Sequence, residues 1–258
     1  MTDGELVELG DGRIWLADSG GDGPPLVLLH PGVGDSRIWD GALPALLDRF
    51  RVIRYDVRGY GRSPRPAGPY AMLADLRAVL DRLGLRRVHL AGCSMGGGTA
   101  LGLAVESPER VASLVLLCPG VPGWPWPPDP AGDAEYERLA AAGDVAGLTE
   151  FGLRAWATSG HDGAARAQLR SAAAAWPVED VHLRPDPPVF DRLSPGLGVP
   201  VRVLVGELDL PAAVDCAAAT AARLGCEPTR LPGVDHLLPL RAPAETVAAV
   251  LAVAALDA

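Results

Sequence analysis

Ser94 lies in a sequence context that suits a catalytic nucleophile. Residues 92–98 read GCSMGGG. The apolar run before them predicts a strand, and the stretch after them predicts a helix. Between a strand and a helix, this G-x-S-x-G spacing is typical of a nucleophile elbow, where small flanking residues permit a strained turn that exposes the serine hydroxyl. A helix that begins at the serine also directs free N–H groups toward developing negative charge. The pattern therefore predicts a serine nucleophile.

A serine hydroxyl needs a base that takes its proton and a carboxylate that orients the base. In this strand-turn-helix context, both partners should follow the serine along the chain. Among the five histidines, His236 lies in a turn between the predicted last strand and last helix, whereas His89 lies on a strand and His30 ends one. Glu207 and Asp209 both follow the preceding strand. We choose His236 as the base and Asp209, rather than Glu207, as the acid.

Strands and helices that alternate along the chain must position these residues. Continuous apolar runs predict parallel strands buried on both faces, and an apolar stripe at spacings of three and four predicts an amphipathic helix. The expected strands span 5–9, 13–18, 24–30, 51–57, 87–92, 111–118, 201–205 and 227–231. The expected helices span 38–49, 72–83, 94–107, 135–142, 145–158, 164–176, 212–224 and 243–256. This order predicts an α/β fold with a mostly parallel, doubly wound sheet, and the Gly10-Asp11-Gly12 turn predicts an antiparallel hairpin at its start.

The composition of the sequence changes at Gly120. The run GVPGWPWPPDP has five prolines in eleven residues, which breaks any regular element, and Ala-rich helical sequence follows it. The strand pattern resumes near Val201. We therefore expect a core made of residues 1–120 and 199–258, interrupted by a helical insertion at 121–198.

Four of the six tryptophans, namely Trp124, Trp126, Trp156 and Trp176, fall in this insertion. One interpretation is that they pack the insertion against the core, because large aromatic side chains dominate such contacts. The other is that some of them, with Trp124, Trp126 and Trp156 as candidates, line a substrate pocket beneath the insertion. Both interpretations can hold for different residues.

Charge and composition narrow the classes of partner. The chain has 32 acidic and 23 basic residues, for a net charge of -9, which is the wrong sign for binding nucleic acid phosphates. Every basic residue is arginine, which excludes lysine Schiff-base chemistry. The partner that fits is a small-molecule substrate.

No sequence feature points to a cofactor, a metal or a membrane. The four cysteines form no C-x-x-C pair, and we expect reduced thiols that are mostly buried, with Cys93 beside the serine as the one that could react. No ligand constellation for a metal or organic cofactor is visible. The first twelve residues lack a basic region, and the longest apolar run, 247–256, is half a membrane span, so we expect a cytoplasmic protein.

With these motifs in place, nearly the whole chain resembles the α/β-hydrolase family. The resemblance rests on His30-Pro31-Gly32 with Trp39 nine residues past His30, the run DVRGYGRS at 56–63, the Ser94 turn, GELD at 206–209, and His236 before the closing helix. It implies that Ser94 is the nucleophile, Asp209 the acid and His236 the base. It also implies that the insertion is a cap or lid.

The resemblance further implies an oxyanion hole. In the family, a backbone N–H just after the His-Gly pair and the N–H of the residue after the serine form it, and these positions correspond to Gly32 and Met95. This sequence has Pro31 where the family commonly has glycine. Proline lacks an N–H, but the donor belongs to the next residue, so the hole can survive with an altered loop. Val33 is the alternative donor.

The function that the resemblance implies is acyl transfer to water. A serine nucleophile argues against the haloalkane dehalogenase and epoxide hydrolase branches, which attack with aspartate. The leading hypothesis is a serine hydrolase that cleaves a small, fairly apolar carboxylic ester, thioester or lactone through an acyl-enzyme and needs no cofactor. The alternatives are a carbon-carbon bond hydrolase, a cofactor-free perhydrolase or oxygenase, and a slow-turnover ligand receptor. These alternatives stay open at the level of sequence, as does the oligomeric state.

Overall fold

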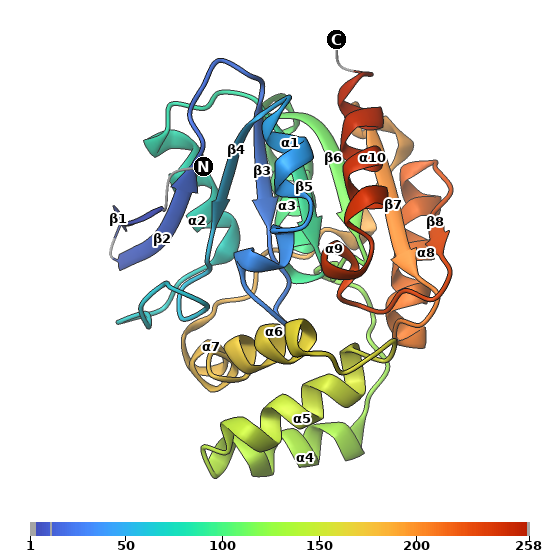
Figure 1. The fold of residues 1–258 in the computed structure, drawn as a ribbon. Coiled ribbons are helices and arrows are strands. Elements are labelled where there is room, and N and C mark those ends of the chain that lie inside the picture. Colours follow the sequence, from blue (N-terminus) through green and yellow to red (C-terminus); the bar gives the residue numbers. More distant parts are fainter. Residues whose placement is uncertain (1–3, 11, 257–258) are drawn as a thin grey trace.

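The computed structural model describes residues 4–10 and 12–256, and in these residues one eight-stranded sheet has the order β1-β2-β4-β3-β5-β6-β7-β8 (Figure 1). The strands are β1 (Glu5–Leu9), β2 (Gly12–Asp18), β3 (Pro25–Leu29), β4 (Arg51–Tyr55), β5 (Val88–Cys93), β6 (Val111–Leu117), β7 (Val201–Gly206) and β8 (Thr229–Leu231). β2 pairs antiparallel with β1 and β4, and all other neighbours are parallel. The predicted fold class, including the initial hairpin, is confirmed. Asp11, in the expected turn of that hairpin, lies outside the described residues.

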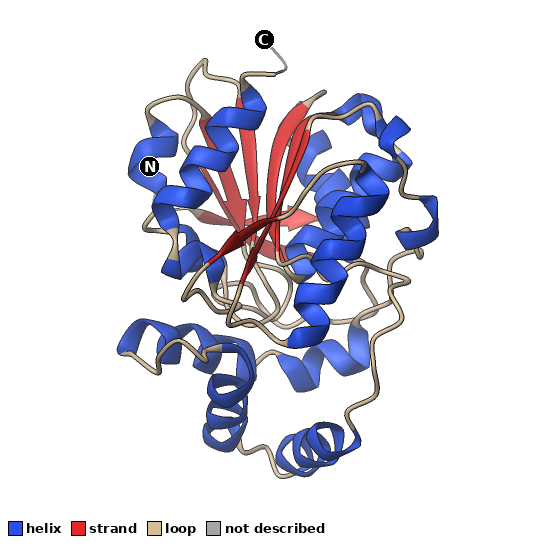
Figure 2. Ribbon diagram, turned by 90° about the vertical axis from the view of Figure 1, so that its right-hand side faces the viewer, coloured by secondary structure: helices blue, strands red, loops and turns tan. Residues whose placement is uncertain are grey.

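Helices cover both faces of the sheet, with α1 and α10 on one side and α2, α3 and α8 on the other (Figure 2). The α-helices are α1 (Leu43–Leu47), α2 (Met72–Arg82), α3 (Met95–Glu106), α4 (Pro130–Ala141), α5 (Val145–Trp156), α6 (Gly163–Ala173), α7 (Trp176–His182), α8 (Pro211–Leu224), α9 (Leu238–Arg241) and α10 (Pro243–Ala254). Short 3-10 turns are η1 (Ser36–Trp39), η2 (Pro108–Arg110), η3 (Phe190–Arg192) and η4 (Pro195–Leu197).

The core lies on both sides of the central strands. Every residue of β5 and of β6 is buried, which is the environment that their continuous apolar sequences indicate for a parallel sheet covered twice. On α2, Leu76, Val79 and Leu80 are fully buried, so the predicted apolar stripe faces this core.

Two helix predictions were wrong because of proline. The single helix expected at 38–49 is divided into η1 and α1, and Pro44 lies in the first turn of α1, where its missing N–H has no intrahelical partner to lose. Likewise, the helix expected at 164–176 ends at Ala173, and a new helix begins at Trp176 with Pro177 in its first turn. α7 and the short α9 were not predicted.

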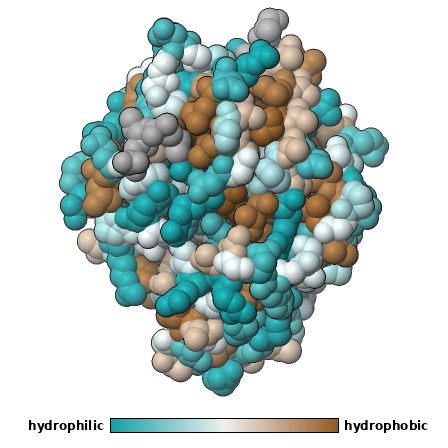
Figure 3. Space-filling model, in the orientation of Figure 1, coloured by the Kyte–Doolittle hydropathy of each residue, from teal (hydrophilic) through white to brown (hydrophobic). Residues whose placement is uncertain are grey.

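The segment between β6 and β7 contributes α4 to α7, which lie beyond the carboxyl ends of the parallel strands (Figure 1). Polar and apolar residues are interspersed over the face of the molecule seen in the same orientation (Figure 3). Among the helices of the described residues, none combines the length and apolar character that crossing a bilayer requires. The position of α4 to α7 places this helical segment over the edge of the sheet where the loops after the parallel strands converge.

Candidate functional site

Ser94 occupies a strained turn between β5 and α3. Its φ of 50° and ψ of -115° lie in a region that side chains other than glycine rarely adopt, at a cost of about 1 to 3 kcal/mol. Three backbone hydrogen bonds of 2.9 Å hold this conformation. The Ser94 N–H donates to the Leu117 oxygen, and the Ser94 oxygen accepts from the N–H groups of Gly98 and Gly120. The surrounding structure therefore imposes the turn that the sequence motif predicts.

The glycines around Ser94 lie where a side chain has no room. A Cβ on Gly92 would lie 2.3 Å from the Gly96 oxygen, and a Cβ on Gly96 would lie 2.4 Å from the Leu29 oxygen. A Cβ on Gly98 would lie 2.1 Å from the Gly120 oxygen. Because these neighbours are backbone atoms, they cannot move aside as a flexible side chain would. The GCSMGGG run is therefore what allows β5, α3 and the loop after β6 to meet at the serine.

Asp209 and His236 form a buried hydrogen-bonded pair. Asp209 follows β7 and His236 follows β8, and the carboxylate oxygens lie 2.9 Å (Oδ1) and 2.8 Å (Oδ2) from the imidazole Nδ1. Because an ionised carboxylate only accepts hydrogen bonds, Nδ1 carries the proton, and Nε2 of the neutral imidazole is left to accept one. The alternative acid, Glu207, is an exposed residue. The structure therefore brings Asp209, the chosen acid, to His236.

His236 also packs against the turn that holds Ser94. Its carbonyl oxygen lies 3.8 Å from Sγ of Cys93, the residue before Ser94, and 3.4 Å from Sγ of Cys118. The two sulfurs are 3.6 Å apart, and both cysteines are buried. This environment fits the expectation that the cysteines are mostly buried thiols. The two thiols fill the space between the His236 turn and the ends of β5 and β6.

The protonation of His236 reflects opposing effects. Burial by itself disfavours the charged imidazolium, but the interactions with Cys118 and with the Asp209 carboxylate outweigh burial and raise the pKa of His236 well above its ordinary value. Burial raises the pKa of the Cys118 thiol, so that sulfur is neutral at neutral pH. The Asp209 carboxylate is therefore the charge that stabilises the imidazolium.

Cys118, Asp209 and His236 are close enough together to reach one metal ion. One ligand atom each from Cys118, Asp209 and His236 lies within 4.8 Å of the other two. However, Asp209 and the Nδ1 of His236 already satisfy each other, and burial opposes the thiolate form of Cys118 that a metal would need. The chemistry of this donor set does not favour a metal.

Gly32 lies against Met95, as the expected oxyanion hole requires. A Cβ on Gly32 would be 3.4 Å from Sδ and 3.8 Å from Cβ of Met95, so the Met95 side chain packs against Gly32. The Pro31 carbonyl that precedes Gly32 accepts from the Gly34 N–H at 3.3 Å, and Nδ1 of His30 lies 2.8 Å from it. Within the described residues, neither the Gly32 N–H nor the Met95 N–H has a protein partner. Two free donors therefore lie next to Ser94.

A cavity of about 770 Å³ opens over Ser94 and Met95. The loop after β6 contributes residues 120–123 and Trp126 to its lining, and residues 183–188 contribute a second wall that includes Arg184 and Asp186. Glu179 from α7 also lines it. The cavity is large enough for a small molecule and places that molecule directly on the serine.

The three candidate tryptophans lie in different places. Trp126 lines the cavity and is 48% exposed. Trp124 packs edge-on against Phe190, with ring centres 4.9 Å apart, and its indole N–H is buried without a partner among the described residues. Trp156 packs against Trp176 at 5.5 Å. Only Trp126 of the three lines the described cavity.

No sequence pattern predicted the Tyr60–Glu179 pair. The Tyr60 hydroxyl donates to the Glu179 carboxylate, and it lies 3.7 Å from the point where a Cβ on Gly32 would be. Burial raises the pKa of Glu179, and the hydrogen bond from Tyr60 opposes that shift in part. Burial also raises the pKa of Tyr60. The pair therefore places a polar group between the cavity and the oxyanion loop.

The loops of the acid and the base are tied to the segment after α5, which sequence analysis also missed. The Thr158 hydroxyl donates to the Leu208 carbonyl, next to Asp209. The Ser159 N–H donates to a carboxylate oxygen of Asp235 at 3.1 Å, next to His236. The helical segment therefore contacts both loops that carry the pair.

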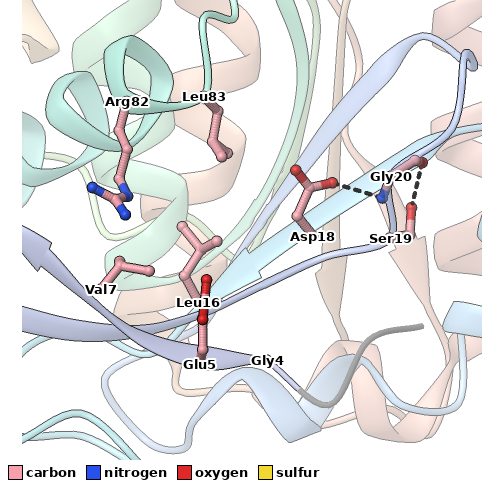
Figure 4. Close-up of a pocket in the computed structure, with 9 residues that line it drawn as sticks. All are labelled: Gly4, Glu5, Val7, Leu16, Asp18, Ser19, Gly20, Arg82 and Leu83. Carbon is pink, nitrogen blue, oxygen red and sulfur yellow. Dashed lines mark hydrogen bonds between the residues drawn. The ribbon is translucent and has the colours of Figure 1, made fainter.

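A second hollow of about 780 Å³ lies away from these residues, against β1, β2 and the end of α2 (Figure 4). Two of its polar side chains have structural partners: Asp18 accepts from the Gly20 N–H and pairs with Arg51, and the Ser19 hydroxyl donates to the Gly20 oxygen. Its lining residues are Gly4, Glu5, Val7, Leu16, Asp18, Ser19, Gly20, Arg82 and Leu83. None of the candidate catalytic residues lines it, and we assign it no chemistry.

The sequence of the chain is similar to those of known proteins. The alpha/beta hydrolase fold family matches residues 24–154. A curated relative from Caulobacter segnis, whose provisional name is carbamate hydrolase RutD, is 42% identical over 111 residues, which are 41% of this chain and 40% of that protein. The chain thus spans about two fifths of the length of this relative.

Two solved structures are similar over almost the whole chain. A hydrolase from Pseudomonas aeruginosa PA01 is 28% identical, with a TM-score of 0.78 and 98% of both chains covered. The carboxylesterase CesB from Bacillus subtilis is 25% identical, with a TM-score of 0.80, and the match covers 97% of this chain and 90% of that one. The likeness therefore includes the helical segment between β6 and β7 as well as the sheet.

Proposed function

Because the chain belongs to the alpha/beta hydrolase fold family, we propose that it is a serine hydrolase that cleaves a small, fairly apolar carboxylic ester, thioester or lactone. The observation that carries this proposal is the strained Ser94 that lines the 770 Å³ cavity, together with the Gly32 and Met95 N–H groups, which have no partner in the described part of the chain. The buried Asp209–His236 pair against the same turn supplies the base. The similarity to a carboxylesterase supports the substrate class.

In the proposed mechanism, the Ser94 hydroxyl attacks the carbonyl carbon while His236 Nε2 accepts its proton. Asp209 keeps the other imidazole proton on Nδ1 and stabilises the imidazolium that forms. The N–H groups of Gly32 and Met95 bind the oxyanion, an interaction that strengthens only as the charge develops. The imidazolium then protonates the leaving group, and water resolves the acyl-enzyme with His236 again as the base.

We also propose that residues 121–198 form a cap over the core. Support comes from the position of α4 to α7 beyond the carboxyl ends of the strands, and from residues of this segment that line the cavity above Ser94. An apolar acyl or alkoxy group would lie against Trp126 and the prolines at 185, 187 and 188. The cap would then decide which substrates reach the serine.

The experiment that tests the proposal is labelling with a fluorophosphonate together with a panel of esters, thioesters and lactones. The wild-type chain should be labelled at Ser94 and should hydrolyse members of the panel. Ser94→Ala should keep its thermal midpoint, lose the label, and lose turnover by a factor on the order of 10⁴ or more. Hydrolysis that persists in this variant would remove Ser94 from the reaction.

A further inference from the structure

Trp176 makes a direct hydrogen bond to the loop that carries the proposed oxyanion donor. Its indole N–H donates to the Gly32 carbonyl oxygen at 2.6 Å. Trp176 is the first residue of α7, in the segment between β6 and β7, whereas Gly32 follows β3. The contact therefore joins the helical segment to the catalytic loop across 144 positions of sequence.

The indole of Trp176 is itself held in place. The Trp156 ring lies 5.5 Å and the Tyr136 ring 6.3 Å from it, centre to centre. On the α5 side, a Cβ on Gly152 would be only 2.9 Å from Cη2 of Trp176, so the helix backbone approaches the ring closely. Side chains and backbone from α4 and α5 thus form a packed socket, and the N–H has a defined direction.

The hydrogen bond matters because Gly32 has no side chain to restrict its dihedral angles. Glycine samples more of φ/ψ space than other residues, so external contacts must fix the peptide planes on both sides of it. The plane before Gly32 is held by the bond from Gly34 to the Pro31 oxygen. The plane after Gly32 is the one whose oxygen Trp176 binds. The two hydrogen bonds together fix the dihedral angles of Gly32, whose N–H lies in the first plane, and the second plane carries the N–H of Val33, the alternative donor.

Two further side chains of the helical segment hold the same loop. Gln168 accepts from the Asp35 N–H at 2.9 Å, and the Ser171 hydroxyl donates to the Asp35 carboxylate at 2.6 Å. Both lie on α6, and Asp35 and Gln168 are buried. The loop from Pro31 to Asp35 is therefore held at both ends by α6 and α7.

We propose that Trp176 is a positioning residue for the oxyanion hole, so that the helical segment completes the catalytic centre as well as covering it. This inference rests on the proposed function, with Gly32 as one of the two donors. An oxyanion donor acts in the transition state, so a misplaced Gly32 lowers kcat and changes KM little. A residue that only packs would lower the thermal midpoint without separating these two constants.

The test is Trp176→Phe, which keeps an aromatic ring in the socket and removes the N–H. We expect kcat for a short ester such as p-nitrophenyl acetate to fall about tenfold, less than the 10² to 10³ that loss of a direct donor costs, with KM within about twofold. The Ki of an alkylboronic acid, which forms a tetrahedral adduct with the serine, should rise by the same factor as kcat falls. Affinity for the transition-state analogue is the readout that packing alone does not move.

The matched control is Trp39→Phe. Trp39 is fully buried, and its indole N–H has no partner among the described residues, so this change removes similar ring volume and no hydrogen bond. It should lower the thermal midpoint and leave kcat and the boronate Ki of the folded enzyme unchanged. If Trp176→Phe behaves like Trp39→Phe, the inference is overturned.

A second variant covers the case in which Trp176→Phe does not fold. Gln168→Met has nearly the same volume and removes the acceptor for the Asp35 N–H, and it should also lower kcat and weaken the boronate together. Unchanged values for a folded Gln168→Met would then overturn the inference. If the wild-type chain itself neither hydrolyses esters nor takes the fluorophosphonate label, the proposed function fails and the inference fails with it. Wild-type activity that is insensitive to these changes overturns the inference alone.

Discussion

Replacing Asp209 with asparagine should abolish most of the activity through the tautomer of His236. The carboxylate accepts hydrogen bonds from two N–H groups: His236 Nδ1 lies within 2.9 Å of both oxygens, and the Leu210 N–H donates to Oδ1 at 2.7 Å. An asparagine has only one oxygen. Because the Leu210 N–H can only donate, the amide oxygen must remain at the Oδ1 position, which places the NH₂ group where Oδ2 was, 2.8 Å from the imidazole.

An amide NH₂ in that position donates to Nδ1 and forces the proton of neutral His236 onto Nε2. The imidazole then presents a donor to Ser94 in place of an acceptor, and it cannot act as the base. We expect kcat to fall by about 10⁴, equivalent to about 5.5 kcal/mol of transition-state stabilisation at about 1.4 kcal/mol per tenfold change. The fold should persist, because the substitution conserves shape and the Leu210 hydrogen bond.

The assay is initial-rate hydrolysis of p-nitrophenyl butyrate at pH 8 by Asp209→Asn and by Glu207→Gln, with the thermal midpoint of each. Glu207 directly follows β7, two residues before Asp209, and it is exposed, so its change tests charge removal without loss of the imidazole contact. Activity of Glu207→Gln should stay within about twofold of wild type. Asp209→Asn with more than a tenth of wild-type turnover, or a larger loss in Glu207→Gln, would refute this reasoning.

Three further predictions concern pH, the cavity and the turn. Since the pKa of His236 is raised and its neutral form is the base, kcat/KM should rise with pH through a midpoint above that of an ordinary histidine, as a pH–rate profile would measure. Trp126→Ala should lower kcat/KM for long acyl esters by up to about tenfold and change acetyl esters little, whereas Trp124→Ala should lower the thermal midpoint with an unchanged chain-length profile. Gly96→Ala should cost about 3 kcal/mol in denaturant unfolding, because the new methyl group would lie 2.4 Å from a backbone oxygen, whereas Gly102→Ala on the same helix would meet only a leucine methyl at 3.4 Å.

Each of these has a contrary result. A pH–rate profile whose midpoint lies at or below the ordinary pKa of histidine would contradict the effect assigned to Asp209. Equal losses for acetyl and long-chain esters in Trp126→Ala would remove that ring from the substrate path. Equal stabilities of the two glycine variants would show that α3 can shift away from β3.

The sequence by itself determined the features that depend on neighbouring residues. Continuous apolar runs predicted β3, β5 and β6 to within about a residue, because a strand covered on both faces is mostly apolar along its whole length. The GCSMGGG run predicted the turn at Ser94 because only glycine fits where backbones nearly touch. The order of serine, acid and histidine along the chain pointed to Asp209 and His236, which the tertiary structure brings together.

Only the tertiary structure decided which distant residues meet. The bonds from Trp176 to Gly32 and from Tyr60 to Glu179 join residues 144 and 119 positions apart, and whether they form depends on how α7 is oriented over the sheet. The chain breaks between α6 and α7, just before Pro177, and the helical pattern of 164–176 concealed this break. Similarly, Trp124 and Trp126 are two residues apart in one proline-rich run, yet one packs on Phe190 and the other lines the cavity. Local sequence specifies elements, whereas the direction of a side chain in a segment without regular structure is set by the surfaces that it happens to contact.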